Sequence, residues 1–242
     1  MHPNWPKPSE FPTLSGDAIH VWAVPLDLSW ASATELNHLL SPEERARADG
    51  FVVDKPRLAF VAGRAALRSL LGCYLDLPPE RAPIVLEPTG KPRLVGGDLR
   101  FNVAHSGDLA LVAVTRGCEI GVDVELARTV DHAHEIAARN FHPAEQAALR
   151  AASAAELPAV FMRLWTRKEA VLKAVGVGLG YPLARFSSFA NAEGDGWISL
   201  PAHASLPDTR CWLQDIRMCV DCLAAVATLE FRQPPLGFTY SL

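Results

Sequence analysis

The sequence has few cysteines and no excess of basic charge. Five cysteines occur in 242 residues, an odd number that is too sparse for the disulfide framework of a small secreted domain. The net charge of -4 excludes the chain-wide basic field that dominates affinity for nucleic acid. We therefore expect a protein of a reducing compartment that has no nucleic-acid partner.

Long apolar runs are also missing. No segment approaches the roughly 18 apolar residues of a membrane span, and the first residues lack the apolar stretch of a signal peptide. We therefore expect a cytoplasmic protein with no membrane partner. The chain does contain 49% hydrophobic and 21% charged residues, enough to bury one large core or two modest ones.

Cys219 and Cys222 form a C-x-x-C motif, which occurs in redox pairs and in halves of zinc sites. The surrounding residues 217–224 are typical of a β-strand, in which positions three apart point to opposite faces. We therefore predict two ordinary thiols at these positions.

Helical and strand patterns alternate in blocks. Ser41, Pro42 and Glu44 are typical of a capped helix start. Gly72 is predicted to close the next helix, over 55–71. Each half of the chain has helices followed by strands, which indicates an α+β fold. Helices are predicted to start at 41 and at 143 and to span 55–71 and 159–175. Several strands are predicted within 84–114, and single strands over 19–24, 119–126, 197–200, 211–216 and 220–229.

The strand over 119–126 carries two carboxylates on one face. Alternation separates Asp123 and Glu125 from the apolar side chains of the strand and places them roughly 7 Å apart. One interpretation is a solvated acidic face. The other is a Mg²⁺ site, since this ion binds one or two carboxylates and completes its shell with water and phosphate oxygens.

The helix over 159–175 has a charge in its apolar stripe. At ~100° per residue, Lys168 projects into the middle of the stripe, with Glu169 at its edge and Lys173 one turn further. In one interpretation Lys168 extends its ammonium to the surface and Glu169 pairs with Lys173. In the other, these groups face a polyphosphate and its metal.

Two turns could bind phosphate. The segment with His105, Ser106 and Gly107 combines a histidine donor with approachable backbone N–H groups, although a lone histidine in a turn is more often inert. The turn of Gly90 and Lys91 is a common connector and indicates little alone.

Taken in order, these segments resemble the Sfp-type 4′-phosphopantetheinyl transferases over about residues 40–229. The resemblance includes the family's "GRxxLR", "GKP" and "G(I/V)D(I/V)E" motifs, and its signature "WxxKEAxxKAxGxGL" is present without a gap. The matching stretches are residues 41–48, 63–68, 90–92, 102–106, 121–125, 141–145 and 165–179.

The resemblance implies an α+β fold of two similar halves related by a pseudo-twofold axis, with antiparallel sheets packed against helices. The N-terminal half would span residues 1–117, and the C-terminal half, 118–242, would carry the metal-binding strand and the signature helix. Coenzyme A would bind in the cleft between them. The implied activity is that of a holo-acyl-carrier-protein synthase. The enzyme, a monomer, would transfer 4′-phosphopantetheine to a serine of an apo acyl or peptidyl carrier protein and release adenosine 3′,5′-bisphosphate.

The resemblance also implies roles for individual residues. Mg²⁺ would be held by Asp123, Glu125 and Glu169. Glu169 would also act as the base for the serine, with Lys168 either assisting proton transfer or orienting Glu169. Coenzyme A would be contacted by Arg47, Arg64, Gly90, Lys91, Ala104, His105 and Lys173, of which Arg64 could instead support the fold.

Two positions depart from the family pattern. Ala104 replaces a serine, which would leave Ser106 or backbone N–H groups to contact phosphate, and His142 replaces a Ser or Thr that caps a helix. Two other functions remain open. A non-catalytic binding module would be expected to have lost a metal ligand, and a Mg²⁺-dependent phosphohydrolase would leave the other motifs unexplained.

Overall fold

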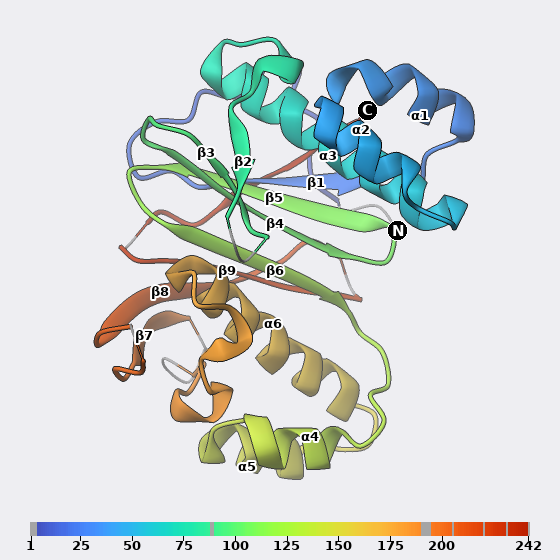
Figure 1. Ribbon diagram of the computed structural model, residues 1–242. Coiled ribbons are helices and arrows are strands. Elements are labelled where there is room, and N and C mark those ends of the chain that lie inside the picture. Colours follow the sequence, from blue (N-terminus) through green and yellow to red (C-terminus); the bar gives the residue numbers. More distant parts are fainter. Residues whose placement is uncertain are drawn as a thin grey trace.

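A computed structural model describes residues 4–87, 90–189, 195–204, 206–219, 221–230 and 232–241 (Figure 1). It contains two α+β units, each built from a sheet and one long helix, and so confirms the expected fold class. The described helices are α1 (Trp30–Leu36), α2 (Pro42–Asp49), α3 (Asp54–Leu75), α4 (Ala133–Asn140), α5 (Pro143–Ala151) and α6 (Leu157–Val175).

The first sheet has the strand order β10-β1-β5-β4. Its inner strands are mostly apolar and α3 covers one face, so that helix and sheet share a core that includes Trp22, Leu67 and Val112. A short hairpin, β2-β3, stands beside it. The strands are β1 (His20–Pro25), β2 (Ile84–Leu86), β3 (Pro92–Leu94), β4 (Leu99–Ser106), β5 (Leu109–Arg116) and β10 (Leu236–Thr239).

The second sheet has the order β6-β9-β8-β7, and all of its pairs are antiparallel. Helix α6 packs on one face, where Val171 and Leu172 meet Leu213 in a shared core. Helices α4 and α5 cover the first part of α6. The strands are β6 (Ile120–Leu126), β7 (Gly196–Leu200), β8 (Thr209–Ile216) and β9 (Cys222–Thr228).

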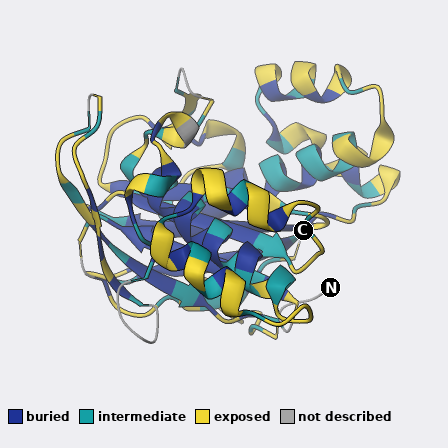
Figure 2. Ribbon diagram, turned by 90° about the horizontal axis from the view of Figure 1, so that it is seen from below, coloured by how far each residue is buried: buried dark blue, intermediate teal, exposed yellow. Residues whose placement is uncertain are grey.

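The two sheets pack against each other between the long helices, which gives the layers α3, first sheet, second sheet and α6 (Figure 1). Their shared core includes Val21, Leu111, Val122 and Val226. The edge strands β4 and β6 lie side by side, and the buried Asn102 side chain accepts a hydrogen bond from the Val122 N–H at 2.9 Å. The central strands are largely buried and the outer helix faces are exposed (Figure 2).

Helix starts follow the sequence closely. Ser41 and Glu44 form the predicted capping box of α2. His142 replaces the usual hydroxyl residue but still caps α5, since its Nδ1 accepts from the Ala144 N–H at 3.4 Å.

Several predictions need correction. Helix α3 does not end at Gly72 but continues to Leu75, and Asp76 closes it with a φ of 53°. Gly72 is needed for another reason, because a Cβ there would lie 2.6 Å from the Leu77 carbonyl oxygen of the returning chain. Helices α1 and α4 and strand β10 were not predicted from the sequence, and β10 pairs parallel with β1. The predicted division near 117 falls between β5 and β6, yet β10 joins the first sheet.

The expectation that no segment reaches the length of a membrane span also needs correction. By length and composition alone, the 22-residue helix α3 qualifies, with a mean hydropathy of 1.3 in its best window. Half of that window is buried in the structure, and buried core helices pass the same test. This feature is therefore weak evidence for a membrane segment.

Candidate active site

The contact between β6 and α6 depends on Gly121. A Cβ at this position would lie 2.1 Å from the Ala170 carbonyl oxygen and 2.3 Å from the Ala174 nitrogen. Only glycine allows the strand to approach the helix backbone this closely. Because side chains alternate along a strand, Asp123 and Glu125 lie on the same face of β6 as Gly121, toward α6.

Two carboxylates on these elements each bury one oxygen that has no hydrogen-bond partner. Asp123 is 7% exposed and its Oδ2 has no hydrogen-bond partner; Oε1 of Glu169 has none either. Burial raises the pKa of Asp123 to about 6, although the positive charge of Lys173 lowers it. The negative charges of Glu169 and Glu125 raise it further. Burial also raises the pKa of Glu169. The Glu125 charge contributes to the raised pKa of both carboxyl groups.

Two lysines from different halves meet beside them. The Lys173 ammonium lies 2.7 Å from Asp123 Oδ1 and donates to the Val122 carbonyl oxygen at 3.1 Å. Its ion-pair partner is thus Asp123 rather than Glu169. Lys91, directly before β3, donates to the Lys173 carbonyl oxygen at 2.7 Å and so satisfies an acceptor in the last turn of α6. Burial lowers the pKa of Lys91.

The chemistry of these donors fits Mg²⁺. Among the described residues, no three or more His, Cys, Asp or Glu side chains are already grouped as a metal site. However, Mg²⁺ needs only one or two carboxylates when water and phosphate oxygens complete its shell. The unpartnered oxygens of Asp123 and Glu169 are hard donors of this type.

The residues of the β4 turn lie on different faces. His105 is exposed at the end of β4, and within the described part of the chain its ring makes no hydrogen bond or ion pair. Ala104 points the other way into the core between the sheets, with 3% exposure, so its side chain is not available to a ligand. Gly90 is exposed in its turn with a φ of 84°.

The structure brings Arg47 and Arg64 together around one aromatic ring rather than next to the carboxylates. Their guanidinium carbons lie 5.2 and 5.8 Å from the Phe60 ring centroid. Arg47 is exposed, whereas Arg64 is mostly buried and lies 3.4 Å from Glu44. Burial lowers the pKa of Arg64. These contacts give Arg64 a role in holding α2 on α3.

Lys168 lies apart from the carboxylate group. Its ammonium is fully buried, forms an ion pair with Glu145 at 2.9 Å and donates to the carbonyl oxygens of Leu183 and Phe186 at 2.8 and 2.7 Å. All three donors of the ammonium are thereby used. Lys168 holds α5, α6 and the following loop together and does not orient Glu169.

Sequence reasoning did not find the polar contacts between β4 and β6. Besides the Asn102 bond described above, the Ser106 hydroxyl donates to Glu125 Oε2 at 2.8 Å. Asn102 stands between the apolar residues Phe101 and Val103, which was a usable signal, because a buried amide requires partners.

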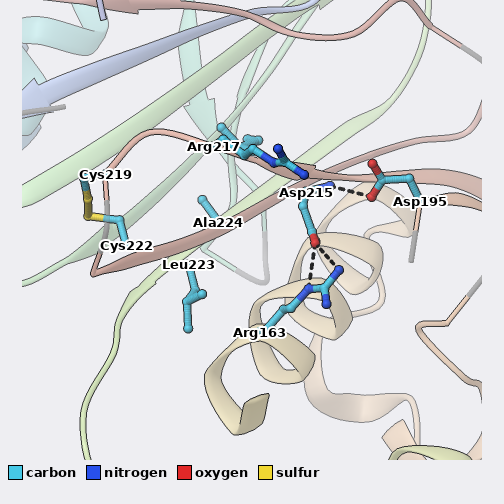
Figure 3. Close-up of a pocket in the computed structure, with 9 residues that line it drawn as sticks. Arg163, Asp195, Asp215, Arg217, Cys219, Cys222, Leu223 and Ala224 are labelled. Atoms are coloured by element: carbon cyan, nitrogen blue, oxygen red, sulfur yellow. Dashed lines mark hydrogen bonds and ion pairs between the residues drawn. A yellow bond between two sulfur atoms is a disulfide. The ribbon is translucent and has the colours of Figure 1, made fainter. Parts of the chain in front are cut away.

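A separate pocket lies between β8, β9 and the first half of α6 (Figure 3). Arg163 forms an ion pair with Asp215 at 2.6 Å, and the Asp215 N–H donates to Asp195 at 2.9 Å. None of the predicted site residues lines this pocket.

The two cysteines of the C-x-x-C motif line this pocket. Cys219 and Cys222 are joined in a disulfide with a Cα–Cα distance of 5.3 Å (Figure 3). Cys219 lies before β9 and Cys222 begins it. Strand alternation therefore does not govern the segment between them, and the prediction of two ordinary thiols was wrong.

Each half of the chain is similar to known proteins. Residues 22–117 match the family model "4′-phosphopantetheinyl transferase, N-terminal", and residues 119–220 match that of the 4′-phosphopantetheinyl transferase superfamily. The chain is 35% identical to the 4′-phosphopantetheinyl transferase HetI of Nostoc sp. over 99% of both chains. It is 32% identical to the 4′-phosphopantetheinyl transferase psf-1 of Bacillus pumilus, over 70% of this chain and 72% of the relative. The chain belongs to the 4′-phosphopantetheinyl transferase superfamily.

Proposed function

We propose that this protein transfers the 4′-phosphopantetheine group of coenzyme A to a serine of an apo acyl or peptidyl carrier protein, as a holo-acyl-carrier-protein synthase does. The second product is adenosine 3′,5′-bisphosphate. One observation carries the proposal: Asp123 and Glu169 each bury a carboxylate oxygen without a hydrogen-bond partner, next to the Lys173 ammonium. The names of the relatives support the same reaction.

Asp123, Glu125 and Glu169 would hold Mg²⁺ in this proposal. When bound, the ion supplies positive charge to the pyrophosphate of coenzyme A. The raised pKa of Asp123, caused mainly by burial, is consistent with a site that favours an added cation.

The transfer forms a bond between the serine oxygen and the β-phosphorus of coenzyme A. It breaks the bond between that phosphorus and the oxygen that leaves with adenosine 3′,5′-bisphosphate. Glu169 takes the serine proton through the carboxylate oxygen that does not face the cation. Lys173, at the end of α6, stabilises negative charge on the transferred and leaving oxygens.

Coenzyme A would lie where the two halves meet. Lys91 is proposed to bind it because its ammonium already bridges the halves at Lys173. His105 has a ring free to donate to phosphate, and the exposed Arg47 can contact it from α2. Gly90 and the backbone near Ala104 would contribute through their main chain. Since one chain supplies both halves, we expect a monomer, which sedimentation would test.

Mass spectrometry of an apo acyl carrier protein incubated with this protein, coenzyme A and Mg²⁺ tests the proposal. The expected result is a gain of about 340 Da on the carrier serine, abolished by EDTA. Asp123→Ala should also abolish it, whereas Asp49→Ala, at a surface ion pair that is 68% exposed on the aspartate side, should not.

Other outcomes would favour other functions. If several carriers gain no mass although coenzyme A binds, the proposal is refuted in favour of a binding module. Release of inorganic phosphate from coenzyme A without carrier modification would instead identify a phosphohydrolase.

A further inference from the structure

The edge strands β4 and β6 bring a hydroxyl of the first half to a carboxylate of the second. Ser106 is the last residue of β4, and its hydroxyl lies 2.8 Å from Glu125 Oε2. The same hydroxyl oxygen accepts from the Leu126 N–H at 3.4 Å. Because that N–H is a donor, the single hydroxyl hydrogen is directed to the carboxylate.

The position of Ser106 is fixed on both sides. Four residues earlier, Asn102 bonds the Val122 N–H and sets how β4 lies along β6. Gly107 follows with a φ of 57°, and a Cβ there would lie 3.0 Å from Leu126 Cδ1. The turn therefore sits directly against the end of β6, and the serine has little freedom to move away from Glu125.

We propose that Ser106 is a positioning residue that orients the Glu125 carboxylate for the cation. The inference rests on the proposed function, in which Glu125 is a metal ligand. A hydrogen bond to Oε2 restricts rotation of the carboxylate and leaves Oε1 to face a cation. The first half, which would bind coenzyme A, thereby also prepares the metal site of the second half.

This role differs from a phosphate contact. The resemblance suggested that Ser106 could replace the hydroxyl lost at Ala104. In the structure its hydrogen is already engaged by Glu125, and Ala104 and Ser106 share the strand face directed away from His105. The two roles predict different binding defects.

The test uses Mn²⁺ as a probe, since free Mn²⁺ is observed directly by electron paramagnetic resonance. Mn²⁺ is titrated into the purified protein with coenzyme A present, and the signal of a protein-free coenzyme A solution is subtracted. Ser106→Ala is expected to weaken Mn²⁺ binding by about 10- to 100-fold, as loss of a residue that orients a ligand does. Ser106→Thr, which keeps the hydroxyl, is expected to restore most of it.

Coenzyme A affinity is measured separately by calorimetry in EDTA, and unfolding midpoints are recorded for each variant. The inference expects both to be unchanged in Ser106→Ala. Weaker coenzyme A binding with normal Mn²⁺ binding would overturn it in favour of a phosphate contact. A lower midpoint with normal Mn²⁺ binding would overturn it in favour of a purely structural role.

Failure of the proposed function gives a different result. If the unaltered protein binds no Mn²⁺ beyond the coenzyme A blank, or binds it equally well after Asp123→Ala, the metal site itself is refuted together with this inference. If Asp123→Ala abolishes Mn²⁺ binding and Ser106→Ala leaves it intact, only the role of Ser106 is refuted.

Discussion

Replacing Lys168 with methionine keeps an unbranched side chain of similar length and removes the ammonium group. The change leaves the Glu145 carboxylate, which is fully buried, without a cation. It also leaves the carbonyl oxygens of Leu183 and Phe186 without this donor. Removal of one partner from a buried ion pair costs about 3–5 kcal/mol. We expect the free energy of unfolding to fall by that amount.

Urea unfolding followed by tryptophan fluorescence measures this loss. With a slope of about 2–3 kcal/mol per molar urea, the midpoint should fall by roughly 1–2.5 M. Lys55→Met is the matched control, because Lys55 is 76% exposed in its ion pair with Asp108 and should cost less than about 1 kcal/mol. Transfer activity per folded molecule should remain. An unchanged midpoint with abolished transfer would refute this reasoning and give Lys168 a catalytic role.

Two further predictions concern packing and pH. Gly121→Ala should lower the free energy of unfolding by about 3 kcal/mol, because the new Cβ meets the backbone of α6, which cannot yield. A Cβ at Gly180 meets nothing within 4 Å, so Gly180→Ala is the control, and thermal unfolding compares the two variants. Burial lowers the pKa of His20 to about 4, so the unfolded chain binds more protons as the pH falls below 6.5. The free energy of unfolding should be highest above pH 6.5 and should decline by up to about 3 kcal/mol toward pH 4. Urea midpoints measured across this range should vary less in His20→Gln than in the unaltered protein. Equal variation in both proteins would contradict the role given to His20.

Local patterns predicted the elements that carry the site. Strand alternation placed Asp123 and Glu125 on one face, and helical spacing marked Lys168 as a charge in an apolar stripe. Spacing could not identify the partner of Lys168, since Glu145 reaches it only through tertiary packing. The same limit applies to Lys173, which pairs with a strand residue instead of its helix neighbour.

Other features were missed because their signal is not local. Strand β10 has four residues and no alternating pattern, and its pairing with β1 joins segments more than 200 residues apart. The Cys219–Cys222 disulfide was missed because a turn interrupts the expected strand. Ser106 was recognised as polar and close to the site, but its partner depends on how two sheets meet.

The return of the chain to its first sheet has a consequence for synthesis and folding. Strand β1 has one neighbour, β5, within the first half, and among the described strands β10 alone pairs with its other edge. During translation this edge therefore stays open until residues 236–239 emerge, and an unpaired edge can recruit other chains. Cutting the chain between the halves would not yield two complete units, because it would separate β10 from β1.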